Sequence, residues 1–119
     1  MRYWTEEEAR SYLPRLRLLL AAVQEAARRA SAARSNGHGS RQRPAGPAPV
    51  SLEEALGELS RNSIVLRDPL SGLVDFPARG QDGVEYLLCW RVDEQDLGFW
   101  HLPEEGFAGR KPLPRNPGS

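Results

Sequence analysis

The sequence predicts an α+β domain in which two helices pack on a small antiparallel sheet. An apolar stripe with helical spacing runs through residues 5–34, and a shorter stripe runs through residues 51–61. From residue 64 to residue 101, strand-like segments alternate with short turns. Connections this short cannot cross over a sheet, so we expect an antiparallel meander of three to four strands.

Residues 1–34 are predicted to contribute one long N-terminal helix. Thr5 and Glu8 have the spacing of a capping box at its start. Apolar residues then fill three positions of every heptad, as in a helix that faces a core. Pro14 lies inside this stripe, and because the stripe continues in phase we expect a kink rather than an end. The stripe consists of Ala9, Tyr12, Leu13, Leu16, Leu19, Leu20, Val23, Ala26, Ala27, Ala30 and Ala33.

The rest of the chain divides at a stretch rich in Gly, Pro and Ser. We expect residues 35–50 to be a flexible linker and residues 114–119 a disordered tail. Residues 51–113 then hold a short helix and the sheet of the same domain. Ser51 and Glu54 form a second capping box at the start of that helix.

The unequal lengths of the two helices predict self-association. The first helix spans about eight turns and the second about three. The second helix therefore leaves much of the first stripe uncovered, and either the sheet or a second copy of the chain must cover it. We expect a second copy, with the stripe from Leu13 to Val23 not fully enclosed by its own chain. Such a surface is typical of an interface, and it predicts a homodimer formed through the N-terminal helix.

Four segments have the pattern of strands, and the third is the longest. Its Leu88 and Trp90 point to one face and its Leu87 and Cys89 to the other, so both faces are partly apolar. This pattern predicts the central strand of the sheet. The four segments are Ile64–Arg67, Leu73–Ala78, Val84–Val92 and Leu97–His101.

Charge and composition exclude several classes of function. Lys and Arg balance Asp and Glu at 16 each, so neither nucleic acid nor an anionic membrane is an expected partner. Residues 1–50 carry nine Arg against four Glu, and residues 51–119 carry seven Lys or Arg against twelve Asp or Glu. The halves, at +5 and −5, are expected to attract each other within the fold or between subunits, or to offer a basic helix to an acidic partner. The acidic start resembles no signal peptide and no apolar run could span a bilayer, so we expect a cytoplasmic protein.

Four polar residues lie within the apolar, aromatic C-terminal region and are candidates for a binding site: Asp75, Glu94, His101 and Arg110. Glu94 and His101 flank the last predicted hairpin, a placement that could bring their side chains within reach of each other. A histidine beside a carboxylate can serve as a general base or as half of a metal site. The structural alternative is that His101 donates to a carbonyl or a carboxylate and fixes the corner before Pro103.

Two further features also admit a structural and a functional interpretation. Asp75 sits in a strand, where it could pair with Arg91 or Arg79 across the ladder. In the segment Glu104–Arg110, glycines and a final arginine could hold a phosphate or a carboxylate. The structural alternative there is a tight turn with Phe107 placed in the core.

The sequence predicts no catalytic residue, no metal ligand set and no cofactor. A metal site needs three or four ligands, and the chain has no His-x-x-x-His or Cys-x-x-Cys spacing. Cys89 is the only cysteine, so an internal disulfide is excluded. Next to Trp90 in a central strand, its thiol is expected to be a small buried apolar group.

Five segments together resemble a known family. EEARSYLPRLRLLL, RDPLSGLVDFPA, YLLCWR, FWH and GFAGR are similar, in order and spacing, to bacterial proteins grouped as domain of unknown function family 2203. The resemblance covers about Tyr3–Val23 and Val50–Leu113. It implies helices beside a small sheet and no assigned activity. The linker and the short second helix differ from the longer helical hairpin that the family implies.

These observations favour a non-catalytic interaction module that associates with itself. The alternative belongs to a different class: a protein, or an enzyme, that binds a small anion or a metal through Asp75, Glu94, His101 and Arg110. A cleft that brings these four side chains together would favour the alternative.

Overall fold

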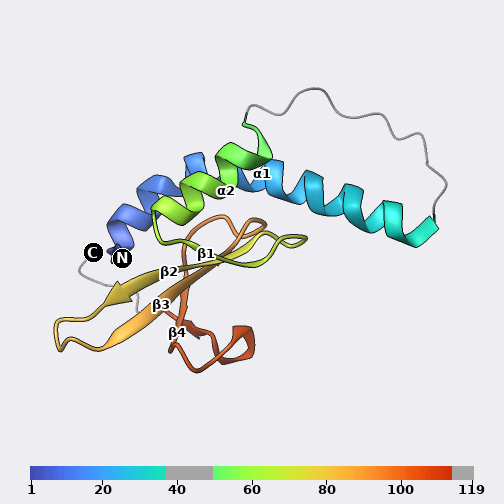
Figure 1. The fold of residues 1–119 in the computed structure, drawn as a ribbon. Helices are drawn as coiled ribbons and strands as arrows, with labels where there is room; N and C mark the ends of the chain where they lie inside the picture. The colour runs from blue at the N-terminus through green and yellow to red at the C-terminus, as the bar shows by residue number, and fades with distance from the viewer. Residues whose placement is uncertain (37–49, 114–119) are drawn as a thin grey trace.

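The computed structural model describes residues 1–36 and 50–113. Most of the predicted linker and all of the predicted tail lie outside these residues. Within them the chain forms two helices and one antiparallel sheet, which confirms the predicted α+β class (Figure 1).

Helix α1 (Glu6–Asn36) begins at the predicted capping box. The Glu8 amide donates to the Thr5 hydroxyl at 3.0 Å, and the Thr5 amide donates to the Glu8 carboxylate at 3.1 Å. The helix continues through Pro14 without interruption, and it also includes residues 35–36, which were expected in the linker. The kink at the proline stays a prediction.

Helix α2 (Leu52–Arg61) runs alongside the first half of α1 (Figure 1). Ser51 caps it, and the reciprocal bonds with Glu54 confirm the second capping box. Glu58 ties the two helices together, because its carboxylate accepts from the Tyr12 hydroxyl and from the Arg15 guanidinium.

The sheet has five strands in the order β1-β2-β3-β4-β5, one more than the upper limit predicted. The extra strand, β5, is two residues long and contains a proline, so no strand pattern marks it in the sequence. The predicted central strand, β3, is the middle one. The strands are β1 (Val65–Asp68), β2 (Leu73–Arg79), β3 (Glu85–Arg91), β4 (Phe99–His101) and β5 (Lys111–Pro112).

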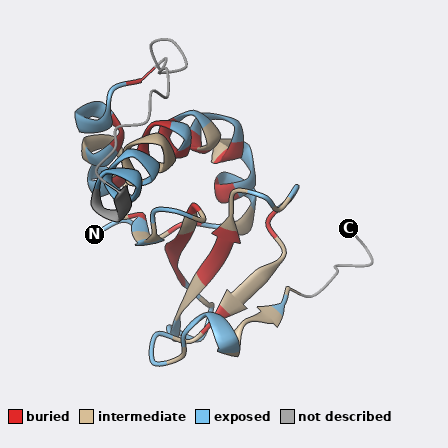
Figure 2. Cartoon of the chain, turned by 90° about the vertical axis from the view of Figure 1, so that its right-hand side faces the viewer, coloured by how far each residue is buried: buried red, intermediate tan, exposed pale blue. Residues whose placement is uncertain are grey.

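Both helices cover the same face of the sheet, and the hydrophobic core lies between the two layers (Figures 1 and 2). On this helix-facing side, β2 contributes Val74 and Phe76 and β3 contributes Leu88 and Trp90, all fully buried. Successive strand residues point to opposite faces, so the residues between them lie on the outer face, away from the helices.

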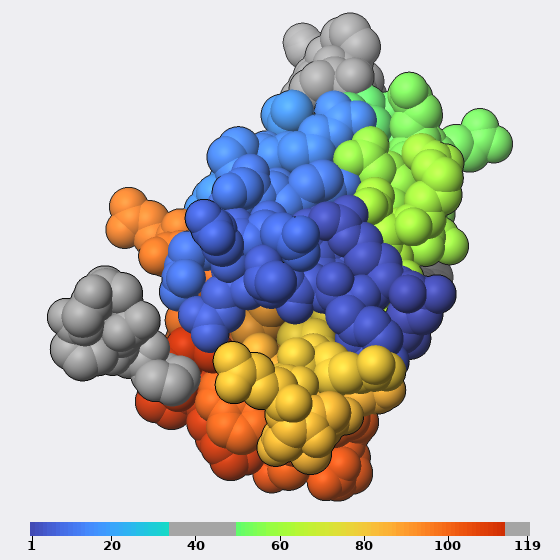
Figure 3. Space-filling model, turned by 90° about the vertical axis from the view of Figure 1, so that its left-hand side faces the viewer, coloured from blue at the N-terminus to red at the C-terminus, as the bar shows by residue number. Residues whose placement is uncertain are grey.

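The expectation that the stripe from Leu13 to Val23 stays uncovered is wrong. Its large side chains are at most 4% exposed. The sheet and the loop before β4 cover what the short α2 does not: Arg10 donates to the Leu97 carbonyl at 3.0 Å, and the Leu97 side chain is buried in the same core. The N-terminal segment and the first turns of α1 lie against the β2–β3 hairpin (Figure 3). Only the later part of α1 extends past α2 and the sheet, with Ala30 and Ala33 exposed (Figure 1).

Among the described helices, none combines the length and the apolar character needed to cross a membrane.

Candidate functional site

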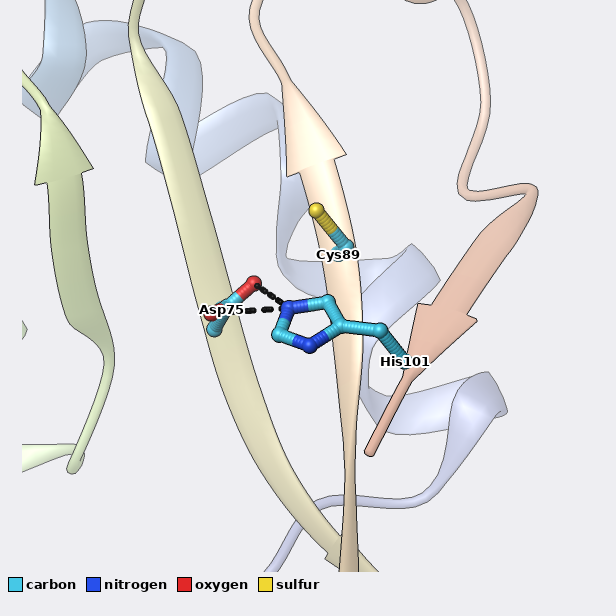
Figure 4. A group of neighbouring side chains, drawn as sticks. All are labelled: Asp75, Cys89 and His101. Carbon is cyan, nitrogen blue, oxygen red and sulfur yellow. Dashed lines mark hydrogen bonds and ion pairs between the residues drawn. The ribbon is translucent and has the colours of Figure 1, made fainter. Parts of the chain in front are cut away.

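Three neighbouring strands bring Asp75, Cys89 and His101 together on the outer face of the sheet. Asp75 of β2 pairs in register with Cys89 of β3. His101 of β4 pairs with Leu87, which places it diagonally from Cys89 on the same face. The imidazole reaches across β3 toward Asp75, and the cysteine stands on the strand between them (Figure 4). We call these three residues the Asp-Cys-His cluster.

The cluster is buried although neither α1 nor α2 covers it. Asp75, Cys89 and His101 are 0%, 1% and 2% exposed. The chain after β4, which includes the 3-10 helix η1 (Phe107–Gly109), covers them. Between this segment and the sheet lies a cavity of about 140 Å³. The cavity is lined by the cluster and by Arg67, Leu73, Pro103, Glu105, Gly106 and Phe107.

The hydrogen bonds of His101 define the face that it turns to Asp75. Its Nδ1 lies 2.9 Å from the Leu102 carbonyl oxygen, which can only accept, so Nδ1 carries a proton. In the neutral ring Nε2 then holds a lone pair. Both carboxylate oxygens of Asp75 stand 3.1 Å from that nitrogen. Acceptors therefore face each other, and a positive species, either a second proton or a metal ion, must lie between them.

The Arg67 side chain and burial shape the electrostatics of the cluster. Arg67 Nε donates to Asp75 Oδ2 at 2.6 Å, so the carboxylate has one counter-charge. Burial, followed by the nearby Asp75 carboxylate, raises the pKa of the Cys89 thiol to about 12. Without a bound cation the thiol is therefore protonated at neutral pH. Its burial confirms the prediction of a small buried group.

Glu94 and Arg110 form a second pair outside the cavity. Arg110 Nη2 lies 2.7 Å from both Glu94 carboxylate oxygens, and the Arg91 amide donates to the same carboxylate at 2.9 Å. The Arg110 guanidinium stands 4.0 Å from the centre of the Phe99 ring and 4.6 Å from that of Phe107. This pair joins the turn after β3 to the start of β5.

The four predicted site residues thus form two pairs and not one cleft. His101 contacts Asp75, and Glu94 contacts Arg110, so the expected approach of Glu94 to His101 does not occur. His101 does bind a carbonyl and a carboxylate at the corner after β4, as its structural interpretation predicted.

Two further expectations about this face are wrong. Asp75 does not pair with Arg91 or Arg79, which bind Asp93 and Glu85. Instead, Arg67 reaches it from β1 and His101 reaches it from β4, across β3. Phe107 is not in the core. It is 43% exposed and stacks beneath Arg110, whose guanidinium pairs with Glu94.

Sequence reasoning missed Cys89 and Arg67 as parts of the site. The signal that could have found Cys89 is the alternation of the strands combined with hairpin register. Counting two residues at a time along the β2–β3 hairpin places Asp75 and Cys89 on one face. The register of β1 shifts between Leu66 and Asp68, so the same counting does not place Arg67.

The Asp-Cys-His cluster can chemically act as a metal ligand set. Its carboxylate, thiol and imidazole donor atoms all lie within 4.8 Å of one another. Donors bound to a tetrahedral zinc ion at about 2.0–2.3 Å lie about 3.3–3.8 Å apart, so small side-chain shifts would close the set around an ion.

Comparison with known proteins yields one match. A model of the family described as "Uncharacterized conserved protein (DUF2203)" matches residues 2–113, nearly the whole chain. Neither a curated protein nor a solved structure matches. The family model covers both helices and all five strands, including the three that carry the Asp-Cys-His cluster, and the chain belongs to the DUF2203 family.

Proposed function

We propose that this protein binds a transition-metal ion, most suitably Zn²⁺, through Asp75, Cys89 and His101. The proposal departs from the sequence-based expectation of no metal ligands, because the three residues are distant in the chain and only the fold collects them. It keeps Asp75 and His101 from the predicted binding set and replaces Glu94 and Arg110 with Cys89.

One observation carries the proposal: His101 Nε2 lies 3.1 Å from both Asp75 carboxylate oxygens, and both residues are buried. The other nitrogen donates to a backbone carbonyl, which is the arrangement that fixes the tautomer and orientation of metal-binding histidines. The bond from Arg67 to Asp75 is likewise of the kind that orients a ligating carboxylate.

The donor types decide which metal fits. A thiolate and an imidazole favour Zn²⁺ and similar first-row ions, whereas Mg²⁺ and Ca²⁺ prefer sites made of oxygen atoms. Zinc would also displace the thiol proton of Cys89, since a coordinating thiol is deprotonated outright. We therefore expect each bound ion to displace two protons, one from Cys89 and one from between His101 Nε2 and Asp75, and the affinity to rise with pH.

The direct test is a zinc titration of the metal-free protein against a chromogenic chelator, with metal content after dialysis as a second readout. We expect one equivalent of bound Zn²⁺ in the wild-type protein. Cys89→Ala and His101→Gln should each lose at least tenfold in affinity. His38→Gln, at the only other histidine, is the matched control and should bind as wild type does.

Cobalt substitution keeps the test independent of any unfolding in the variants. Co²⁺ bound to the wild-type protein should show the near-ultraviolet charge-transfer absorption of a thiolate ligand, and Cys89→Ser, which retains the shape of the side chain, should lack it. Absence of saturable Zn²⁺ or Co²⁺ binding by the folded wild-type protein, or equal binding by Cys89→Ala and His101→Gln, would overturn the proposal.

We also propose that the protein associates with itself through α1. The contact would involve a later part of the helix than the stripe from Leu13 to Val23. The stripe from Leu13 to Val23 no longer supports it. What supports it is the later stripe, where Ala30 and Ala33 are exposed on a helix that extends beyond α2 and the sheet. Small side chains allow a second copy of the helix to approach closely.

Sedimentation velocity at micromolar concentration tests this second function. A dimer should dissociate in Ala30→Glu and persist in Ser31→Glu, which places the same charge outside the stripe. A wild-type protein that remains monomeric throughout the concentration range contradicts the idea.

A further inference from the structure

We infer that the proposed metal site takes a small monoanion, such as a carboxylate, as its fourth ligand. The ion and Arg67 would hold this anion jointly. This inference rests on the proposed metal binding. Three protein ligands leave one position open on a four-coordinate ion, and here that position would face the cavity beside the sheet.

The charges around the cluster leave one positive charge to be balanced. A divalent ion would be met by the Asp75 carboxylate and the Cys89 thiolate, with His101 neutral. Arg67 then adds one positive charge, since its guanidinium remains charged at any ordinary pH. The Arg67 side chain is 43% exposed, while the Asp75 carboxylate that it contacts is 1% exposed. A monoanion at the open position would neutralise the remaining positive charge beside the ion.

The other charged groups on the cavity wall already balance each other. Glu105 Oε1 accepts from Lys111 Nζ at 2.7 Å and from the Leu102 amide at 3.0 Å. The bond from Lys111 also keeps the pKa of the Glu105 carboxyl below its usual value. Glu105 is therefore committed to its own lysine, and the excess charge at Arg67 is not met from this side.

Arg67 is placed to share the anion with the ion. Its Nε is taken by Asp75, which fixes the plane of the guanidinium. Among the described residues, its two terminal nitrogens have no hydrogen-bond partner, and the side chain lines the cavity. An oxyanion bound to the ion through one oxygen could accept from these nitrogens through another, as carboxylates commonly do with arginine.

The cavity limits the size of the ligand. Its volume of about 140 Å³ corresponds to a few water molecules at about 30 Å³ each. Leu73, Pro103 and Phe107 form its apolar walls, which suit a short hydrocarbon group and exclude a hydrated polyvalent anion. Formate and acetate are therefore the probes that match the site.

The experiment titrates the Co²⁺-loaded protein with formate and with acetate while recording its visible spectrum. Wild-type protein should show a saturable spectral change with either anion. Arg67→Met keeps the aliphatic stem and removes the charge, and it should bind the anion about tenfold more weakly or worse, as expected for a lost charge-assisted bond. Arg79→Met is the matched control, because Arg79 binds Glu85 away from the cavity, and it should behave as wild type.

Each outcome separates the two proposals. A protein that takes up no Co²⁺ overturns the metal site and this inference together. A protein that binds Co²⁺ with a thiolate signature, but whose spectrum ignores both anions, overturns this inference alone. A response that appears only in Glu105→Gln would assign the fourth position to Glu105 and would also overturn it. Equal anion affinity in Arg67→Met and wild type would show that Arg67 does not hold the anion, and it would overturn the inference.

Discussion

The two faces of the sheet are built from the same strands but are closed in different ways. The helix-facing side meets α1 and α2 through large apolar residues such as Phe76 and Trp90, both fully buried. The outer face buries Asp75 and His101 just as completely, beneath a short segment that contains a single 3-10 turn.

The difference separates the face that stabilises the fold from the face on which we propose a metal site. Apolar burial stabilises the fold by about 25 cal/mol per Å², so the helix-facing side needs no further explanation. A buried carboxylate and imidazole contribute little net stability, because the cost of removing them from water offsets their attraction. Their burial beside a cavity supports the proposal that this face binds a ligand.

The comparison predicts its largest effect on the helix-facing side. Phe76→Ala should lower the free energy of unfolding by about 3–5 kcal/mol, because it leaves a cavity between the helices and the sheet. Cys89→Ala, at the next strand on the outer face, should cost about 1 kcal/mol when chelator is present. Urea unfolding monitored by circular dichroism measures both. Equal losses would mean that the two faces do not differ as described.

An intermediate effect is expected when the buried carboxylate is neutralised. In metal-free protein, Asp75→Asn should cost about 1–3 kcal/mol, since Arg67 and His101 lose their charged partner. Asp96→Asn is the matched control. Asp96 also binds an arginine but is 69% exposed, so its replacement should change the unfolding free energy by about 0.5 kcal/mol or less. If the two substitutions cost the same in chemical denaturation, burial of the outer-face charge is energetically unimportant.

The smallest effect concerns the polar rim of the helical layer and depends on pH. Bonds from Arg15 and Tyr12 lower the pKa of the Glu58 carboxyl from 4.5 to about 2. Because the folded pKa is the lower one, the carboxylate stabilises the fold above pH 4.5 and loses this contribution as pH falls toward 2. Glu58→Gln should therefore cost about 0.5–1 kcal/mol at pH 6, and this cost should shrink as pH falls through 2.

Thermal unfolding at several pH values checks this expectation. Glu104→Gln, at an exposed position, provides the control and should follow the wild-type curve. A Glu58→Gln variant whose deficit persists unchanged at pH 2 would show that packing, and not charge, is lost.

Local patterns were sufficient to predict most of the fold. Both capping boxes, the continuation of α1 through Pro14 and the central position of β3 follow from spacing and alternation that act within a few residues. The fifth strand was missed because a two-residue segment has no periodicity. The enclosure of Leu13–Val23 does not follow from local patterns, because it depends on how much of the stripe the sheet covers in the folded chain.

What the sequence determined by itself is therefore the class of the fold, the helix starts and the face on which each strand residue lies. The tertiary structure alone decided which polar residues meet. Asp75, Cys89 and His101 come from three strands, and their convergence depends on hairpin register and on the path of the chain after β4. Register and long-range packing are set by the whole domain, so a site assembled from them leaves no local signature in the sequence.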